Sequence, residues 1–510
     1  MPPLVSQGLL IIAKPVLGTF EYTSKNNTKD YNYLIGIACI KNRIVFIGDV
    51  NDAKRFLKNK YKTIDMSNHF VLPGFIDSHT HCFASIKAMN SVNLSFSKAS
   101  NTKEKVMNIL YDAIKAKKND ECLIAVGFDE TLMKSNWYPS RDELDKLSSN
   151  HSIQIIHRTG HASFLNSKAL KICEINESTH EPQGAYFSRD IYSGMLDGYI
   201  IGFNAIIDKK MEKFKEKFSK NDMMKWLKIQ VSQGITTITH ANPDSNIYDW
   251  QFFIELLEAN AFIPNIILME SIHLLNEKRF PRNGLNGRVL RGHTKLILNE
   301  FESLVEEDRN ELKSIIAMCE KQERKLAVHV ISNNTIDYII GLIKETKTTI
   351  IKRIEHAPML NDDQMNNLIS KKISIVAQPG ILHEAQNRYK KLITEKDMKY
   401  LHPWKSFIDQ GGVLAFSSDS PVTSQSPLLS ISYASIQRPK ELNFFEKVEP
   451  LQAIQAWTAT GAKVNNLSNR GFLKSGYMAD IILVDRNPIH EPEKTSVVMT
   501  LISGNIAYSK

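Results

Sequence analysis

The chain has 510 residues, of which 42% are hydrophobic and 23% charged, as is ordinary for a globular enzyme. At this length, one large α/β barrel with an accessory domain fits better than several small domains. The formal net charge is +9, but the basic residues lie in mixed-sign stretches such as Lys103–Lys118 and Met211–Trp226. Such stretches are typical of solvated helix faces, so we predict no nucleic-acid partner.

The cysteines and the hydropathy of the chain indicate in which cellular compartment the protein is expected. The five cysteines are scattered and form no CxxC pair, which argues against a disulfide framework and a thiolate zinc site. The first residues lack the basic and apolar regions of a signal peptide, and no apolar run reaches the ~20 residues that a membrane span needs. We therefore expect a cytoplasmic protein with no membrane partner.

Both ends of the chain have the pattern of short β-strands. In residues 1–70, β-branched runs such as GLLIIAKPV and NRIVFIGDV alternate with turn residues. The tail shows the same pattern in ADIILVDRNP and VVMTLISGNIAYSK. We predict that residues 1–70 and 469–510 form one small composite β-sandwich domain.

The middle of the chain, residues 71–468, repeats a buried strand run, a loop and an amphipathic helix. This repeat predicts an α/β fold, a (β/α)₈ TIM-like barrel. The long gap after the first run predicts an overhanging insertion at about residues 83–150. The eight runs are Val71–Ile76, Ile153–Arg158, Ile235–His240, Thr294–Leu298, Lys325–Val330, Ile351–His356, Ser374–Gln378 and Val413–Ser418.

Ionisable residues lie at the ends of these runs, on the face of a barrel where its chemistry resides. His79 and His81 stand at i and i+2, so they point to the same side and can bind one ion together. Imidazole and carboxylate ligands suit a divalent metal, Zn²⁺ first with Fe²⁺ or Mn²⁺ as alternatives. The other ionisable residues at strand ends are Asp77, Lys295, His329, Glu355, His356 and Asp419.

Six segments carry a resemblance to a known family: Val71–His81, His157–Leu170, Glu181–Asp190, Arg353–Gln364, Ser417–Leu428 and Gly471–Pro488. They resemble the amidohydrolase superfamily, and within it the amidohydrolase-3 group, which includes N-substituted formamide deformylase-like proteins. The blocks at the first, sixth and eighth strands are specific, whereas the tail is widespread in the superfamily. The resemblance covers essentially the whole chain.

The resemblance implies a set of metal ligands: His79, His81, His329, His356 and Asp419. Lys295 lies where binuclear members have a lysine that CO₂ carbamylates and that then bridges two ions. Many members of the group have Asp-Gly just after this strand, whereas Leu296, Ile297, Leu298 and Asn299 follow here. This departure bears on whether the site holds one ion or two.

The implied activity is hydrolysis of a non-peptide C–N bond, in an amide or an N-formyl or N-acyl amine, by metal-activated hydroxide. Asp419 would take the proton during the attack and hand it to the leaving nitrogen. His161 would contact the substrate and steady the oxyanion, and His240 would face the substrate. The expected partners are a small amide-type substrate and, because dimers are common in such folds, a second copy of the chain.

Two other functions stay open. A mononuclear deaminase of a heterocycle typically has a Glu three residues after the fifth-strand histidine. Ser332 occupies that position here, which counts against deamination. A metal-free scaffold protein would keep the barrel and lose the ligands, but all five core ligands are present. Metal analysis of the purified protein separates these classes.

Overall fold

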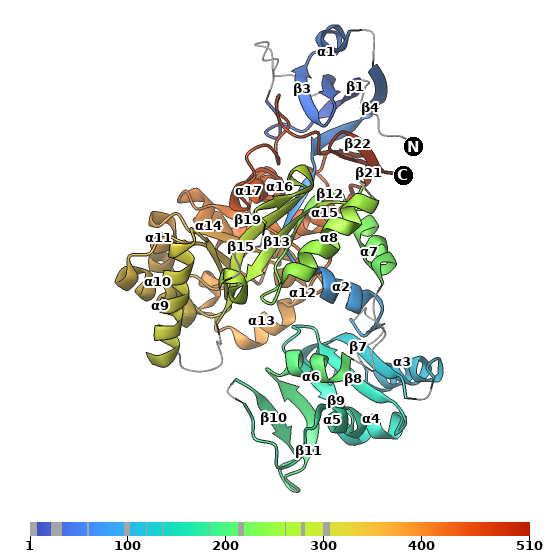
Figure 1. Cartoon of the computed structure of the whole chain (residues 1–510), viewed down its shortest axis with the longest axis vertical. Helices are drawn as coiled ribbons and strands as arrows, with labels where there is room; N and C mark the ends of the chain where they lie inside the picture. Colours follow the sequence, from blue (N-terminus) through green and yellow to red (C-terminus); the bar gives the residue numbers. More distant parts are fainter. Residues whose placement is uncertain are drawn as a thin grey trace. The chain divides into compact units, whose positions relative to one another are not determined.

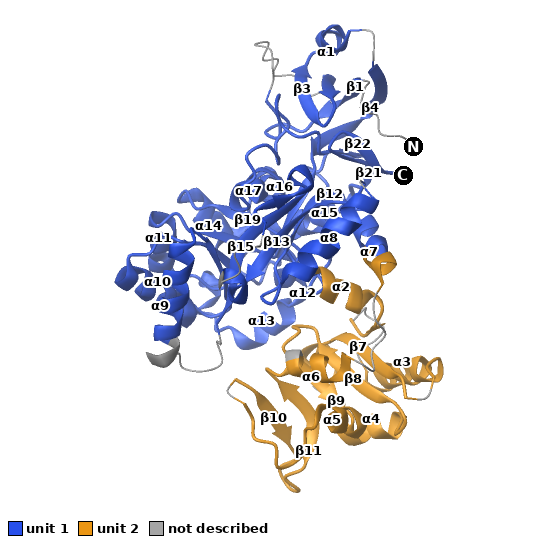
Figure 2. Ribbon diagram, in the orientation of Figure 1, with its two compact units in different colours: residues 1–81, 224–510 blue, residues 82–223 orange. Residues whose placement is uncertain are grey.

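The computed structural model describes residues 8–21, 33–58, 61–95, 102–118, 120–135, 137–182, 184–212, 219–260, 262–276, 281–298 and 306–510. The chain divides into two compact units. The barrel unit comprises Met1–His81 and Met224–Lys510, and the second unit comprises Cys82–Met223 (Figures 1 and 2).

Strands from both ends of the chain form one seven-stranded sheet in the barrel unit, in the order β22-β21-β20-β4-β1-β2-β3 (Figure 1). Its middle is the antiparallel pair β4–β20, which joins Pro73 to Ile481. Apolar side chains such as Ile37, Val71 and Leu483 are fully buried on it. The strands are β1 (Gly8–Pro15), β2 (Ile35–Ile40), β3 (Arg43–Gly48), β4 (Tyr61–Pro73), β20 (Ile481–Val484), β21 (Val497–Ile502) and β22 (Asn505–Ser509), and helix α1 (Val50–Leu57) packs against β2.

Eight parallel strands form a nearly closed barrel, which confirms the predicted fold class. Several of them are buried along their whole length, as expected when helices cover one face and side chains fill the other. The backbone N–H of Asp419 donates to the carbonyl of His79 (2.8 Å) across the gap between the last strand and the first. The strands are β5 (Phe75–Thr80), β12 (Ile235–His240), β13 (Asn265–Ser271), β15 (Val289–Ile297), β16 (Leu326–Val330), β17 (Ile351–His356), β18 (Ser374–Ala377) and β19 (Leu414–Phe416).

The strand assignment needs two corrections. The predicted second barrel strand, Ile153–Arg158, is β8 (Ser152–His157) of the second unit, and the barrel instead contains β13, which the prediction missed. His240 therefore ends the second barrel strand and not the third. The first barrel strand also begins at Phe75, because Val71–Pro73 belongs to β4 of the terminal sheet. A buried apolar run predicts a strand, but it does not say which sheet the strand joins.

Helices follow the barrel strands along the chain. Helix α8 shows how the sequence starts one: the Asn246 side chain accepts the N–H groups of Tyr248 and Asp249, and Asp249 bonds back to the Asn246 N–H. The helices are α7 (Lys220–Ser232, which begins in the second unit), α8 (Ile247–Ala259), α9 (Glu306–Lys321), α10 (Asn333–Thr346), α11 (Asp362–Ser370), α12 (Pro379–Glu384), α13 (Gln386–Leu392), α14 (Trp404–Asp409), α15 (Pro427–Ala434), α16 (Pro450–Trp457) and α17 (Ala459–Val464). Within the described ranges, no helix has the length and apolar character needed to cross a membrane.

The second unit is built on a six-stranded sheet in the order β10-β11-β9-β8-β7-β6. It runs to Met223, whereas the expected overhang ended at about residue 150. Its core includes Leu110, Leu123, Ile153 and Phe164. The elements are α2 (Cys82–Met89), β6 (Val92–Asn93), α3 (Lys103–Lys115), β7 (Cys122–Phe128), α4 (Arg141–Leu147), β8, β9 (Ala162–Leu165), α5 (Ser167–Cys173), β10 (Tyr186–Arg189), β11 (Leu196–Ile201) and α6 (Asn204–Met211).

Substitution of Trp457, at the end of α16, tests the packing of the barrel unit. Its side chain is fully buried, its ring meets the edge of the Phe75 ring (centroids 6.4 Å apart) and its Nε1 donates to Ser430 Oγ (3.1 Å). We expect Trp457→Ala to destabilise the barrel unit by about 3–5 kcal/mol, through lost burial and the cavity left behind. Urea unfolding followed by circular dichroism measures this, with Tyr248→Ala, an exposed position on α8, as the control. An unchanged unfolding midpoint would contradict this packing role.

Candidate active site

Strand β5 delivers the first polar residues of the site. Asp77, His79 and His81 alternate along the chain, so they share one side of the strand. Asp77 accepts hydrogen bonds from the Ser418 hydroxyl (2.6 Å) and from the Ser418 backbone N–H (3.1 Å). Burial raises the pKa of Asp77 to about 7, against these hydrogen bonds. This contact ties the first barrel strand to the loop after the last one, and so holds the two histidines next to that loop.

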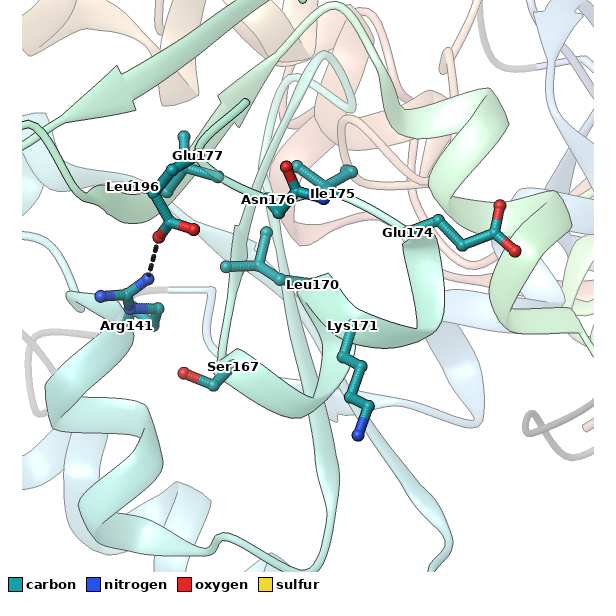
Figure 3. Close-up of a pocket in the computed structure, with 9 residues that line it drawn as sticks. All are labelled: Arg141, Ser167, Leu170, Lys171, Glu174, Ile175, Asn176, Glu177 and Leu196. Carbon is teal, nitrogen blue, oxygen red and sulfur yellow. Dashed lines mark hydrogen bonds and ion pairs between the residues drawn. The ribbon is translucent and has the colours of Figure 1, made fainter. Parts of the chain in front are cut away.

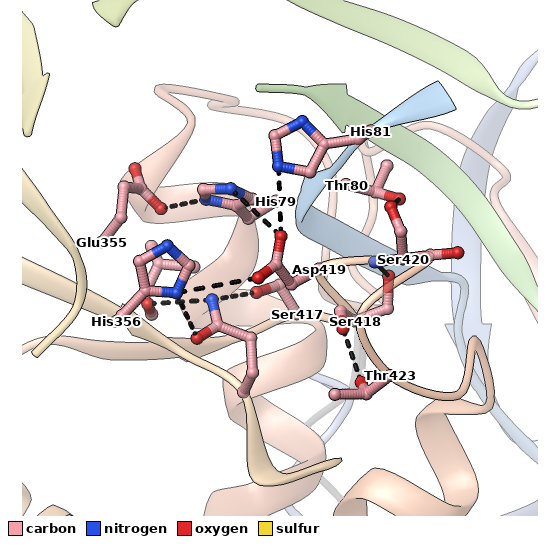
Figure 4. A network of polar contacts seen from close by, with 12 residues as sticks. His79, Thr80, His81, Glu355, His356, Ser417, Ser418, Asp419, Ser420 and Thr423 are labelled. Carbon is pink, nitrogen blue, oxygen red and sulfur yellow. Dashed lines mark hydrogen bonds and ion pairs between the residues drawn. The ribbon is translucent and has the colours of Figure 1, made fainter. Parts of the chain in front are cut away.

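Asp419 lies in that loop and faces both histidines (Figure 4). Its Oδ1 is 3.2 Å from His81 Nε2 and 3.5 Å from His79 Nε2. The ligand atoms of these three residues lie within 4.8 Å of one another. Burial alone would raise the pKa of Asp419, but the close contact with the His81 imidazole holds it below its ordinary value. Two imidazole nitrogens and a carboxylate oxygen therefore converge on one point.

Two further predicted ligands lie beside this group. His356 ends β17, with its Nδ1 3.9 Å from Asp419 Oδ2 and its ring 5.0 Å from the His79 ring. The ring of His329, from β16, lies 4.5 Å from that of His356. His356 has a positive φ of 70°, which turns the chain at the end of the strand. The structure thus brings all five predicted ligands of the core set together.

Lys295 on β15 is also at the site. Its side chain is 2% exposed, and its Nζ has no hydrogen-bond partner among the residues that the structure describes. Burial lowers the pKa of Lys295 to about 8, although the charges of Glu355 and Asp419 act in the opposite direction. A buried lysine with a lowered pKa has the neutral amine needed to react with CO₂.

The two predicted substrate-facing histidines lie in different units. His240 ends β12 in the barrel unit, fully buried, with its ring 5.9 Å from the Phe253 ring. Burial lowers the pKa of His240 to about 3, with smaller contributions from the charges of His81 and His79. His161 lies in the turn between β8 and β9 of the second unit and is exposed. Its predicted contact with the substrate stays a prediction.

The donor set fits a divalent metal. Burial, followed by the charge of Lys295, lowers the pKa of His79 to about 3, so its ring is neutral and has a lone pair to donate. His79, His81 and Asp419 come from the two ends of the barrel sheet, and their side chains point at each other (Figure 4). Neutral imidazoles and an ionised carboxylate at this spacing are ligands that Zn²⁺ accepts.

A second group of potential ligands lies in the second unit. The ligand atoms of Asp129, Glu130 and His157 lie within 4.8 Å of one another. However, the N–H of Thr159 donates to His157 Nδ1 (3.2 Å), so the neutral ring carries its proton on Nε2. That nitrogen is 3.1 Å from Glu130 Oε2, and Arg158 lies 3.6 Å from Asp129. The side chains of this group thus lie in two close contacts, His157 with Glu130 and Arg158 with Asp129, and none of them is among the predicted ligands.

A shallow pocket lies elsewhere in the second unit (Figure 3). Its carboxylates are already paired, Glu177 with Arg141 (3.1 Å) and Glu174 with Lys210. None of the predicted site residues lines it. The predicted site residues therefore point to the barrel and not to this pocket as the active site.

Sequence reasoning placed Asp77 at the end of the first strand, where it precedes His79 by two residues and so shares its side of the strand. It missed two other contributors. Gln378 follows β18 and contacts His356 Nδ1 (2.8 Å), but no local pattern marks an amide as a partner of a distant histidine. Asn465, after α17, bonds to Arg353 (3.0 Å) from 112 residues away. Arg353 and Glu355 form a buried ion pair in the barrel interior.

A nearly closed barrel of parallel strands, with histidines and a carboxylate beyond their carboxyl ends, defines a barrel protein of the metallo-hydrolase type. The model of the Amidohydrolase family matches residues 62–508, and the chain belongs to that family.

The chain is similar to several known proteins along most of its length. Protein LONG AFTER FAR-RED 3 of Arabidopsis thaliana is 23% identical, over 91% of this chain and 87% of the relative. N-substituted formamide deformylase of Arthrobacter pascens is 21% identical, over 92% and 94%. The crystal structure of an uncharacterized metal-dependent hydrolase from Pyrococcus horikoshii OT3 superposes with a TM-score of 0.72 at 18% identity, covering 94% of this chain and 98% of that chain, which supports the fold.

Proposed function

We propose that this protein is a metal-dependent hydrolase that cleaves a non-peptide C–N bond in a small amide, such as an N-formyl or N-acyl amine. The observation that carries the proposal is the convergence of His79 Nε2, His81 Nε2 and Asp419 Oδ1 beyond the carboxyl ends of the barrel strands. Family membership supports hydrolysis, and the relative named N-substituted formamide deformylase supports this class of substrate.

The metal-binding residues in this proposal are His79, His81, His329, His356 and Asp419, with Zn²⁺ as the first choice of ion. When bound, a divalent ion lowers the pKa of a water molecule and polarises the scissile carbonyl. His79 and Asp419 are buried, which limits the access of bulk water to them and strengthens electrostatic interactions there.

Asp419 is the proposed proton carrier. Its pKa is held below the ordinary value, so at neutral pH the carboxylate is ionised and can accept the proton of the attacking water. It then delivers this proton to the leaving nitrogen, since an amide anion is too basic to depart unprotonated. His240, buried next to the metal-binding histidines, and His161, in the second unit, are the proposed substrate-contacting residues.

Lys295 would bind a second ion after carbamylation. Free lysine is a cation and repels a metal ion, whereas the carbamate is an anionic oxygen donor. We expect Lys295→Ala to contain about one ion fewer per chain and to lose on the order of 10²-fold or more in kcat/KM, since a Lewis acid contributes several kcal/mol. Elemental analysis measures the ion, and added short carboxylic acids should restore part of it.

The control for this variant is Lys313→Ala on α9, where the lysine pairs with Glu345 far from the strand ends. Wild-type protein with one ion per chain and an unmodified Lys295 would overturn the binuclear site. The proposal of a hydrolase with a single metal ion would remain consistent with that result.

A screen of N-formyl and N-acyl amines with metal-loaded protein tests the proposed function. Release of amine that depends on the ion supports it. A protein that takes up no Zn²⁺, Fe²⁺ or Mn²⁺ would overturn it in favour of a metal-free scaffold. A deaminase is disfavoured, because the position of the expected acid is occupied by Ser332, whose side chain accepts the Thr335 N–H at the start of α10.

A further inference from the structure

Glu355 lies directly behind His79 and is held rigidly. Its Oε2 is 2.5 Å from His79 Nδ1, and both side chains are buried. Arg353 donates to both carboxylate oxygens of Glu355, and also to the Ser78 carbonyl and to Asn465 Oδ1. A carboxylate can only accept, so in the neutral ring the proton of His79 is on Nδ1 and the lone pair is on Nε2.

Gln378 stands behind His356 in the same way. Its Nε2 donates to the Val376 carbonyl (3.3 Å) and to Ser417 Oγ (3.0 Å), so its Oε1 is the atom that meets His356 Nδ1 (2.8 Å). The opposite amide orientation would bring two acceptors, Oε1 and the Val376 carbonyl, together at 3.3 Å. His356 therefore donates from Nδ1, and its Nε2 keeps the lone pair.

The second unit provides an internal comparison. There, a backbone N–H donates to His157 Nδ1 and places the ring proton on Nε2, the opposite tautomer. The partner behind the ring thus decides which nitrogen can donate to a metal, since a ring nitrogen that carries a proton has no lone pair to offer. Two of the four histidines of the barrel site, His79 and His356, have an acceptor at this position.

We infer that Glu355 and Gln378 are positioning residues, an inference that rests on the proposed metal site. Each holds the proton of its histidine on Nδ1, so that Nε2 of His79 and Nε2 of His356 are the metal-binding nitrogens. Glu355 does so with a charged acceptor and Gln378 with a neutral one. A carboxylate behind an imidazole makes the ring a stronger donor, so Glu355 contributes more to metal affinity than Gln378.

The test is the zinc affinity of metal-stripped full-length protein, measured by competition with a chromophoric chelator. We expect Gln378→Leu to bind zinc ~10–100-fold more weakly. Gln378→Glu restores an acceptor and should recover most of this loss, which a purely structural role would not produce. The matched control is Gln364→Leu, which removes a buried glutamine of α11 that bonds to Asn333 and Asp337 instead of a histidine.

Glu355→Leu, which removes the charged acceptor as Gln378→Leu removes the neutral one, should weaken zinc binding more than Gln378→Leu. This variant also leaves the buried Arg353 without its counter-charge, so circular dichroism must first show that it is folded. If it does not fold, the comparison of Gln378→Leu with Gln378→Glu decides alone.

The outcomes separate the two proposals. Wild-type protein that binds no divalent metal overturns the proposed function and this inference with it. Wild-type protein that binds zinc, with equal affinity in Gln378→Leu, overturns only the inference. An equal loss in Gln378→Leu and Gln378→Glu also overturns it, because packing and not the acceptor would then be responsible.

Discussion

Protein in which His79 and His81 are both replaced by alanine should contain no bound metal and show no hydrolysis, while it remains folded. Both Nε2 atoms point at Asp419 Oδ1, so the double change removes two of the three converging donors. The loss of affinity should exceed the ~10–100-fold typical of residues behind the ligands. The fold should persist because neither ring contributes to the apolar clusters of the terminal sheet or the second unit.

Elemental analysis after dialysis, an assay of amine release and circular dichroism together measure this result. The matched control replaces two exposed histidines, His180→Ala with His490→Ala, and should keep the wild-type metal content. If the His79 and His81 double variant retained its full metal content, the site would have to lie elsewhere in the chain.

Asp419→Asn should separate metal binding from proton transfer. The amide keeps an oxygen of similar shape next to His81, so metal content should fall only modestly. It cannot carry a proton at neutral pH, so kcat should fall by on the order of 10²–10⁴-fold, the range for a general acid–base group. The effect should appear in kcat more than in KM, because the group acts on the reaction and not on substrate binding.

Steady-state kinetics of the metal-loaded variant, with metal content measured on the same sample, tests this expectation. Asp409→Asn is the control, since Asp409 lies on α14 and pairs with Lys405. Near-normal turnover of Asp419→Asn would move the proton-transfer role to another residue, with His240 or His161 next in line.

The barrel could be predicted from the sequence because it is encoded locally, and so could the spacing of the proposed ligands. A run of buried apolar residues shows where a strand begins and ends. Residues two apart on a strand share a side, so the spacing of His79 and His81 alone places their side chains together. In parallel strands the carboxyl ends meet at one face, which gathers His329, His356 and Asp419 without any knowledge of packing. The resemblance to the amidohydrolase superfamily assigned these residues, and Lys295, to a metal site.

Other features were decided only by the tertiary structure. Apolar runs of equal burial joined different sheets, so β8 went to the second unit and β13 to the barrel, because burial pattern does not specify a pairing partner. The hydrogen bonds to the Nδ1 atoms of the histidines were also decided only by the tertiary structure. Glu355 meets His79 from 276 residues away, since two strands on the same barrel aim their side chains into one interior. Local sequence determines which side a residue faces, and only the closed packing determines what it meets there.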